Sequence, residues 1–203
     1  MPFFAFRHLT SDSDLATFGD HFAAQMDRRS KGALPLRVPL TRLQASTRVI
    51  GVFQGDAMVA GYVVHDGPGL YLLNNIPEEQ RAAWLAANDA HDACELAIIW
   101  RNDGIGDIAF AFVVWPRIIL DCVRTGRSMI LGSGYDNPMN QRYRSARPTV
   151  IYSGPSAMTG LHTYVYVYSR LKLIATFFVS FADKFFRRLS RSTRTDPPSG
   201  QPN

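Results

Sequence analysis

Two long apolar runs in the middle of the chain are separated by a short turn that contains two glycines, and this arrangement limits the available folds. The first run, Cys94–Trp100, has the length of a buried strand, and the second covers residues 108–123. Between them lie Arg101, Gly104 and Gly106. Glycines let a backbone approach a bound anion closely, and a helix that starts after such a turn exposes unpaired N–H groups with partial positive charge. The turn is therefore either a plain connection or a cradle for a phosphate-bearing ligand, to which Arg101 would add charge-assisted hydrogen bonds.

The run after the turn has two interpretations. We favour a helix, with Pro116 as an interior kink, because proline removes a helical hydrogen bond. The alternative is a strand over 108–115, since its large apolar residues alternate with smaller ones, after which Pro116 would open a helix at a favoured position. Only the helix places a positive helix end at the glycine turn, so the phosphate interpretation depends on it.

The remaining pattern predicts an α/β (α+β) domain built on one mixed, mostly antiparallel sheet flanked by helices. A length of 203 residues suits one domain, which we place at 1–169, followed by a tail. We expect helices at 11–29, 77–89 and 136–144, a loop at 31–46, a hairpin of 49–53 with 57–64, and further strands at 70–73, 128–134, 148–154 and 162–169.

The cysteines and the chain ends give little sign of metal binding or export. Cys94 and Cys122 both lie in apolar runs without metal-ligand spacing, so we expect two buried, reduced thiols and no metal. No long apolar segment begins the chain, and no stretch reaches the roughly 18 apolar residues of a spanning helix. These observations favour a cytoplasmic protein.

Several motifs occur in the order found in one known family. Arg101, Gly104 and Gly106 fit the pattern [Gln/Arg]-x-x-Gly-x-[Gly/Ala] between a strand and a helix. The hairpin "VIGVFQGDAMVAGYVV" precedes it, "MILGSG" follows it, and "DNPMNQRYRSARP" comes next, with Asp136 or Asn137 and then Tyr143. In this order the segments resemble the GNAT (GCN5-related N-acetyltransferase) superfamily over roughly residues 48 to 168. Two departures are the length of the run after the turn and "SARP" in place of the family's Gly-Phe.

The resemblance implies an N-acyltransferase that moves an acyl group from acetyl-CoA, or a longer acyl-CoA, to a primary amine. It implies that the backbone of Ile98, Ile99 and Trp100 holds the pantetheine arm and polarises the thioester carbonyl. It also implies that Arg101, Gly104, Ile105 and Gly106 bind the diphosphate, with Asn137 as a further cofactor contact. Two alternatives stay open: an acyltransferase that uses long-chain acyl-CoA or acyl carrier protein on an amino lipid or amino acid near a membrane, and a non-catalytic binding module.

Two residues are candidates for proton transfer. Glu95 interrupts an apolar strand, and partial burial would raise the pKa of its carboxyl group toward that of a useful base, although a carboxylate at a strand edge or on the surface is an equal alternative. Tyr143 is the candidate acid for the leaving thiolate. His91 is a weaker candidate base, because a solvated histidine at a strand start explains it better. Cys94 cannot act together with Glu95, because adjacent strand residues point to opposite faces.

The C-terminal region is basic and amphipathic. Residues 170–191 place apolar side chains at helical spacing among lysines and arginines, whereas 192–203 has the composition of a disordered tail. Such a helix packs on its own domain or a homodimer partner, or binds an anionic membrane surface as a peripheral protein. The acceptor would be a small-molecule or lipid amine. We expect no nucleic-acid partner, because no aromatic stacking platform accompanies the basic residues.

Overall fold

The computed structural model describes residues 3–30, 32, 36–135 and 148–174. In these residues one sheet contains seven strands in the order β1-β2-β3-β4-β5-β7-β6. Neighbouring strands are antiparallel except for β4 and β5, which are parallel. The predicted mixed, mostly antiparallel sheet is confirmed. The strands are β1 (Ala5–His8), β2 (Arg48–Gln54), β3 (Ala57–His65), β4 (Ala93–Arg101), β5 (Met129–Tyr135), β6 (Thr149–Pro155) and β7 (His162–Ser169).

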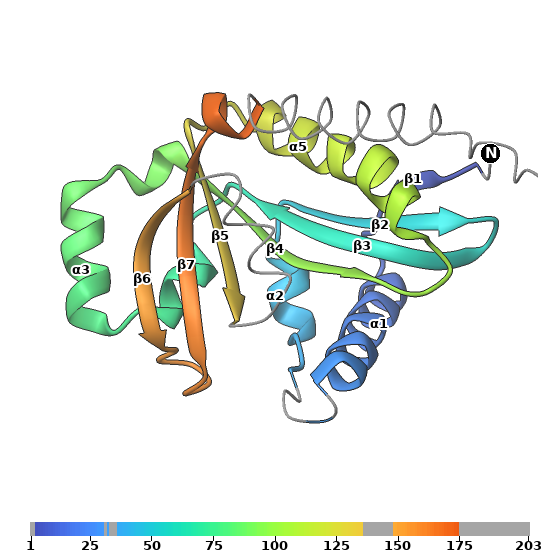
Figure 1. The fold of residues 1–203 in the computed structure, drawn as a ribbon, viewed down its shortest axis with the longest axis horizontal. Helices are drawn as coiled ribbons and strands as arrows, with labels where there is room; N and C mark the ends of the chain where they lie inside the picture. The colour runs from blue at the N-terminus through green and yellow to red at the C-terminus, as the bar shows by residue number, and fades with distance from the viewer. Residues whose placement is uncertain (1–2, 31, 33–35, 136–147, 175–203) are drawn as a thin grey trace, which may run out of the picture.

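Helices cover both faces of the sheet (Figure 1). On one face lies a continuous helical segment of α4 (Asp107–Ala109), the π-helix η3 (Phe110–Val114) and α5 (Trp115–Arg124). On the other lie α1 (Asp12–Ser30) and α2 (Leu40–Gln44). The remaining described helices are η1 (Tyr71–Asn75), α3 (Glu78–Ala87), η2 (Ala90–Asp92) and a stretch at 170–174. None of the described helices has the length and apolar character needed to cross a membrane.

The helix α1 buries the face that its sequence predicts. Leu15, Phe18 and Phe22 are at most 8% exposed and pack on the sheet with Trp100 of β4. Ser11 begins the helix by accepting a hydrogen bond from the N–H of Asp14, 3.1 Å away, which satisfies one of the donors that a helix start leaves open. This packing fixes α1 beside the end of β4, where the glycine turn begins.

The helical interpretation of 108–115 is confirmed, and its proline is accommodated by a local change of pitch. Pro116 has no N–H and cannot donate to the preceding turn. The five residues before Trp115 form the π-helix η3, whose wider turn absorbs the missing bond. Val114, Ile118 and Cys122 remain fully buried against the sheet. The segment from Asp107 to Arg124 is therefore one helix that starts at the glycine turn.

Three parts of the sequence prediction are wrong or incomplete. Residues 70–73 do not form a strand, because most of this segment belongs to the 3-10 helix η1, which buries Leu72 and Leu73 beneath the sheet. The loop predicted at 31–46 contains α2. The edge strand β1 was not predicted, and it pairs with β2 from Ala5↔Phe53 to His8↔Ile50. Its short length and the helix that follows at once hide the alternating pattern of a strand.

The two cysteines are free and buried, as predicted. Cys94 of β4 faces Cys122 of α5 inside the core cluster of that side of the sheet. A hydrogen bond with Cys94, together with burial, raises the pKa of Cys122 well above its usual range. The thiol of Cys122 therefore stays protonated and contributes to packing.

Candidate functional site

The strands β4 and β5 separate after three residue pairs. They pair in parallel at Ala93↔Met129, Cys94↔Ile130 and Glu95↔Leu131, and no pairing between them follows. Beyond this point β4 stays paired with β3, and β5 stays paired with β7. We call this divergence the splay. Among the described residues it leaves one edge of each strand without a strand partner, so we expect backbone groups there to be available to another molecule.

A backbone irregularity marks β4 within the splay. Ile98 has a φ of +53°, and among the described residues it is the one non-glycine with a positive φ. The register with β3 shifts here, because Gly61 pairs with Trp100 and Val63 with Ala97. Ile98 and Ile99 of β4 therefore both stand opposite Tyr62 of β3, and this arrangement is a β-bulge. A bulge leaves one peptide unit outside the hydrogen-bonded pairing of the two strands. A β-branched residue in this conformation is strained by about 1–3 kcal/mol, and such strain is concentrated at functional sites.

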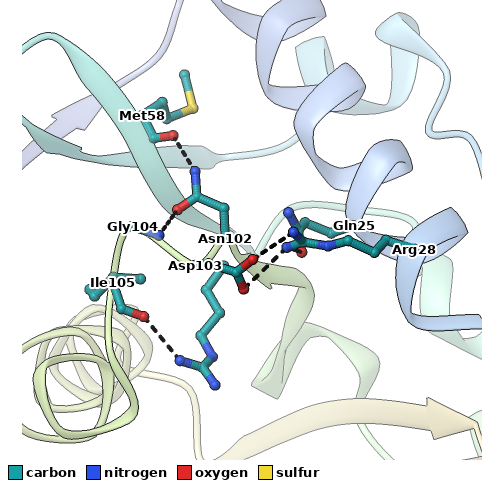
Figure 2. A network of polar contacts seen from close by, with 8 residues as sticks. Gln25, Arg28, Met58, Asn102, Asp103, Gly104 and Ile105 are labelled. Carbon is teal, nitrogen blue, oxygen red and sulfur yellow. Dashed lines mark hydrogen bonds and ion pairs between the residues drawn. The ribbon is translucent and has the colours of Figure 1, made fainter.

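The turn after β4 is held by its own side chains (Figure 2). The carbonyl oxygen of the Asn102 side chain accepts from the N–H of Gly104 at 2.8 Å, and its amide donates to Met58 O at 3.3 Å. The N–H of Asn102 donates to Val59 O at 2.9 Å. Arg101 donates to Ile105 O at 3.0 Å and forms an ion pair with Asp107. The turn is thus preorganised before any ligand binds.

A second ion pair ties the turn to α1. Arg28 contacts both oxygens of Asp103, at 2.7 and 3.4 Å, and also donates to the Gln25 side chain at 2.7 Å. Figure 2 shows these three side chains meeting between the helix and the turn. Arg28 and Asp103 are exposed, so solvent and salt weaken the pair. Both arginines of this region therefore have carboxylate partners.

The helix that follows begins at the end of the turn and faces an open space. Gly106 is the residue before the first helical position, and Asp107 lies in the first turn. A Cβ added to Gly106 would meet nothing within 4 Å, whereas at Gly104 it would lie 2.9 Å from Asn102 Oδ1 and 3.1 Å from Val59 Cγ1. Gly104 is therefore needed for the turn itself, and Gly106 leaves room for a ligand beside the helix start.

Two of the predicted cofactor-binding residues, Trp100 and Ile105, could contact a ligand only through their backbone, because their side chains are buried. Trp100 is 1% exposed, and its ring stacks on His21 and packs edge-on against Phe18 of α1. Ile105 is also 1% exposed and lies in the core beneath α5. Their side chains anchor the ends of the turn. Any contact that these two residues make with a ligand would therefore come from their main-chain groups.

Glu95 has a different environment from the one predicted. We expected partial burial, but its side chain is fully buried and ion-paired with Arg42 of α2. Its Oε2 also accepts from the N–H of Leu72 at 2.9 Å. Burial lowers the pKa of Arg42 to about 10, so its guanidinium remains charged at neutral pH. A carboxylate with these partners anchors α2 and η1 to the sheet, and it has no exposed oxygen with which to take a proton from a substrate.

The other proton-transfer candidates are partly outside the described residues. Tyr143 and Asn137 lie in the segment 136–147, which the structure does not describe, so their roles stay predictions. His91 is exposed in η2, just before β4, where its N–H donates to Asp89 Oδ1 at 2.9 Å. Cys94 points to the opposite face of β4 from Glu95, as predicted.

A cluster of tyrosines near the splay was missed by the sequence analysis. The guanidinium of Arg42 lies 4.4 Å from the ring centre of Tyr71, and Tyr71 makes a small contribution to the raised pKa of Tyr135. Burial raises the pKa of Tyr135, although a hydrogen bond with Thr159 opposes the shift. These residues come from α2, η1, β5 and the β6–β7 turn. These residues are distant in the sequence, so only the fold shows that they lie together. The one feature that the sequence does contain is the polar Tyr135 at the end of the apolar strand β5.

Comparisons with known proteins found relatives only among solved structures. No family model matches the chain, and no curated protein matches it by sequence. The structure of FeeM, an N-acyl amino acid synthase from uncultured soil microbes, superposes with a TM-score of 0.67 over 87% of this chain and 96% of FeeM, at 11% identity. The AHL synthase LasI superposes with a TM-score of 0.58 over 84% of this chain and 91% of LasI, at 12% identity.

A third structure was solved with a ligand. It is yncA from Salmonella typhimurium, reported with its cofactor acetyl-CoA, and it superposes with a TM-score of 0.54 over 82% of this chain and 94% of yncA, at 11% identity. The chain has a GNAT fold. In a GNAT fold the fourth and fifth strands are splayed, and here these are β4 and β5. At identities near 11% the comparisons establish this architecture, and the named activities are those of the three proteins.

Proposed function

We propose that the chain is an N-acyltransferase that transfers an acyl group, most simply acetyl, from an acyl-CoA thioester to a primary amine. The observation that carries the proposal is the combination of the splay with a strained bulge at Ile98 and a helix that opens directly after Gly106. The bulge at Ile98 lies before Ile99–Arg101, and the glycine turn and the helix start at Asp107 follow it. A molecule with a diphosphate at one end and a thioester at the other fits that spacing of backbone donors.

The donor would be held mainly by main-chain groups. The diphosphate would lie at the N–H groups of the turn and the first helical residues, where the helix dipole favours negative charge. The pantetheine arm, which carries amide groups, would take the place of a missing strand in the splay. The backbone at the Ile98 bulge would donate to the thioester oxygen and stabilise the negative charge that develops there.

In the reaction, the amine nitrogen would attack the thioester carbon, and the C–S bond would break as the amide bond forms. The amine must lose a proton, and the thiolate must gain one. We do not assign the first step to Glu95, because Arg42 and the Leu72 N–H occupy its oxygens. Solvent on the face of Tyr71 and Tyr135 would accept this proton. Tyr143 is our candidate for protonating the thiolate.

An alternative is a long-chain acyltransferase that acts on an amino lipid or amino acid and takes its acyl group from acyl-CoA or acyl carrier protein. The similarity to FeeM favours it, since FeeM is described as an N-acyl amino acid synthase and gives a TM-score of 0.67. A third possibility, from another class, is a binding module with no catalysis. The described residues support it less, because a strained bulge such as the one at Ile98 is typical of an active site.

Thermal unfolding with CoA, acetyl-CoA and palmitoyl-CoA separates these functions. A ligand at 100 times its Kd stabilises a protein by about 2.7 kcal/mol, which for this chain length is a rise in Tm of roughly 5–10 °C. The proposal predicts this rise with acetyl-CoA, and its loss in Arg101→Glu, because that variant places a carboxylate beside the diphosphate. A larger rise with palmitoyl-CoA supports the long-chain alternative. No rise with any thioester contradicts both enzyme assignments.

A further inference from the structure

Three arginines converge on one buried carboxylate near the C-terminal end of α5. This carboxylate belongs to Asp121, which is 2% exposed. Its Oδ2 lies 3.1 Å from Arg117 Nε, and its Oδ1 lies 3.6 Å from Arg124 Nη1 and 4.0 Å from Arg48 Nη1. Arg117 and Arg124 belong to α5, and Arg48 is the first residue of β2. We call Arg48, Arg117 and Arg124 the arginine triad.

The core holds Asp121 in place from the side of the sheet. The helix α5 packs on the face formed by β2 and β3 (Figure 1). On this face Tyr62 of β3 is fully buried and donates its hydroxyl to Asp121 Oδ2 at 2.6 Å. Burial and the hydrogen bond with Asp121 raise the pKa of this phenol far above its usual range, so it stays a neutral donor. The triad is therefore gathered around a carboxylate whose position is fixed.

The triad has more hydrogen-bond donors than this carboxylate uses. A guanidinium carries several N–H groups in a planar fork. Arg117 donates to Asp121, whereas the separations of 3.6 and 4.0 Å for the other two arginines are too long for a hydrogen bond. No second carboxylate in the described part of the chain pairs with the triad. The side chains of Arg48, Arg117 and Arg124 are 34%, 39% and 53% exposed, so a ligand can reach their remaining N–H groups.

The charges around Asp121 do not balance. Three positive charges meet one negative charge, and the phenol of Tyr62 is neutral. Positive charges that are held a few ångströms apart repel one another, and partial burial weakens the screening by water and salt. One arginine would be enough to neutralise Asp121. An anion that carries two negative charges would neutralise the remaining two.

We propose that the arginine triad binds a phosphate group. Arginine suits phosphate because its planar fork donates two parallel hydrogen bonds to the phosphate oxygens. The triad is also partly preorganised, which lowers the entropy lost on binding. Arg117 is held by Asp121 and by the ring of Phe6, whose centre lies 5.5 Å from its guanidinium carbon.

This phosphate site is separate from the glycine turn. Asp107 begins the helical segment, and Asp121 lies about 21 Å farther along it at 1.5 Å per residue. The site therefore does not depend on the proposed thioester donor. Its phosphate can come from a free phosphate or phosphate monoester, or from a phospholipid headgroup. Leu120 lies beside the triad on α5 and is 42% exposed, so a lipid would cover it and a free phosphate would not.

Calorimetric titration with inorganic phosphate at constant ionic strength tests the site in the full-length chain. We expect Arg48→Gln combined with Arg124→Gln to weaken phosphate binding at least about tenfold, because each change removes a charge-assisted contact. This double variant keeps the hydrogen bond between Arg117 and Asp121, so the packing of α5 is retained. An unchanged Kd in the double variant, or no binding by the parent at millimolar phosphate, overturns the proposal.

Two further variants show whether the effect belongs to the triad. Arg7→Gln combined with Arg37→Gln removes the same charge from exposed positions elsewhere, and it should bind phosphate like the parent. Equal weakening in this control would reduce the effect to net charge and overturn the proposal. Arg101→Glu should also bind phosphate like the parent. Binding that is lost in Arg101→Glu and kept without Arg48 and Arg124 would belong to the glycine turn, and that result overturns the proposal as well.

Replacing the carboxylate reverses the expected sign. In Asp121→Asn the side chain keeps its shape and can still accept from Tyr62, but the negative charge that competes with the ligand is gone. We expect tighter phosphate binding, by several-fold, together with lower stability. A purely structural role for Asp121 predicts the loss of stability alone. Unchanged or weaker phosphate binding in folded Asp121→Asn overturns the proposal, and the variant without Arg48 and Arg124 decides it if Asp121→Asn does not fold.

Vesicles distinguish the two sources of the phosphate group. Sedimentation with phosphatidylglycerol vesicles is measured for the parent, for the variant without Arg48 and Arg124, and for Leu120→Gln. Reduced sedimentation of both variants supports the site as one for a lipid headgroup. Equal sedimentation of all three, together with phosphate binding that depends on the triad, supports a site for a free phosphate or a phosphate monoester.

Discussion

At the scale of single residues, Ile98 is the position where the backbone departs most from what its side chain prefers. Valine and isoleucine rarely adopt a positive φ, because Cβ comes too close to the neighbouring carbonyl oxygen. The bulge nevertheless places Ile98 there, with Trp100 and Ala97 held in register on β3. The surrounding sheet must therefore enforce the conformation, which is the expected pattern for a strained functional backbone.

Replacing Ile98 with glycine tests this strain. Both Ile98 and Ile99 are half-buried, so Ile98→Gly and Ile99→Gly lose similar apolar contacts and gain similar chain entropy. Only the first relieves a positive φ, so we expect Ile98→Gly to be less destabilising by about 1–2 kcal/mol. Urea unfolding of the two variants measures the difference. A greater loss for Ile98→Gly would show that the conformation is not strained.

The pair of Arg42 and Glu95 allows a test of whether Glu95 acts in catalysis. Removing one partner of a buried ion pair costs about 3–5 kcal/mol, whereas replacing both with apolar residues is often neutral. We expect Glu95→Gln to lower the free energy of unfolding by that amount. Arg42→Met combined with Glu95→Leu should restore most of the stability and keep acyl transfer, measured by thiol release. A stable but inactive double variant would make Glu95 the base after all.

The sequence analysis identified Glu95 of this ion pair but not Arg42. An acidic residue inside an apolar strand pointed to Glu95, but the two interpretations, a base and an edge or surface carboxylate, both missed the buried ion pair that its partner makes possible. Arg42 lies in a proline-rich region that suggested only a loop. Its position under β4 depends on contacts between residues more than fifty positions apart in the chain. The residues next to Arg42 in the sequence do not show that it lies under β4.

At the scale of elements, the strand, glycine turn and helix from Ala93 to Arg124 form the unit on which the proposed function depends. The turn has its own hydrogen bonds, and α1 reaches it through Arg28. The glycines at 104 and 106 have different roles. Gly104 avoids contact with Asn102 and Val59, whereas Gly106 borders open space.

This difference predicts opposite effects for two alanine substitutions. Gly104→Ala should lower stability by about 1–3 kcal/mol, because its Cβ would overlap atoms that hold the turn. Gly106→Ala should leave stability unchanged or slightly raised, since its φ of −68° suits alanine, but it should weaken CoA binding. Thermal unfolding and calorimetric titration measure the two quantities. Equal CoA affinity in Gly106→Ala and the parent would contradict the position of the diphosphate.

Most elements were predicted where their periodicity is long or their turn chemistry is strong. The helix α1, the hairpin of β2 and β3, the strand β4 and the alternating β7 are of this kind. The errors concern short elements, namely β1, α2 and η1. An element of four or five residues shows too little of its period, and its conformation is decided by packing. The bulge at Ile98 was not predicted, because it leaves no local pattern, and the splay likewise has no signal within either strand.

At the scale of the whole molecule, His65 makes stability depend on pH. It is 4% exposed and contacts Pro68 O at 3.2 Å, and burial lowers the pKa of its imidazole below 6.5. Below pH 6.5 the unfolded chain binds a proton that the folded chain does not, so the free energy of unfolding falls as pH decreases. Each unit of pKa shift contributes about 1.4 kcal/mol.

We therefore expect the urea midpoint of the parent to fall between pH 7.5 and pH 5.5, and to fall less in His65→Gln. The window lies above the range in which carboxylates titrate, and Asp92, whose hydrogen bonds with Ser128 lower its pKa, loses its contribution only in stronger acid. His91, which is exposed, serves as the matched control through His91→Gln. Identical pH dependence in His65→Gln and the parent would contradict this role of burial.

The central claim is that the splay and the glycine turn together hold a thioester carrier. A crystal structure of the full chain grown with CoA tests it most directly. We predict the diphosphate against the backbone N–H groups of residues 104–108 and the pantetheine arm between β4 and β5, reaching the Ile98 bulge. Binding of the diphosphate elsewhere, or a turn that stays unliganded at millimolar CoA, would contradict the account.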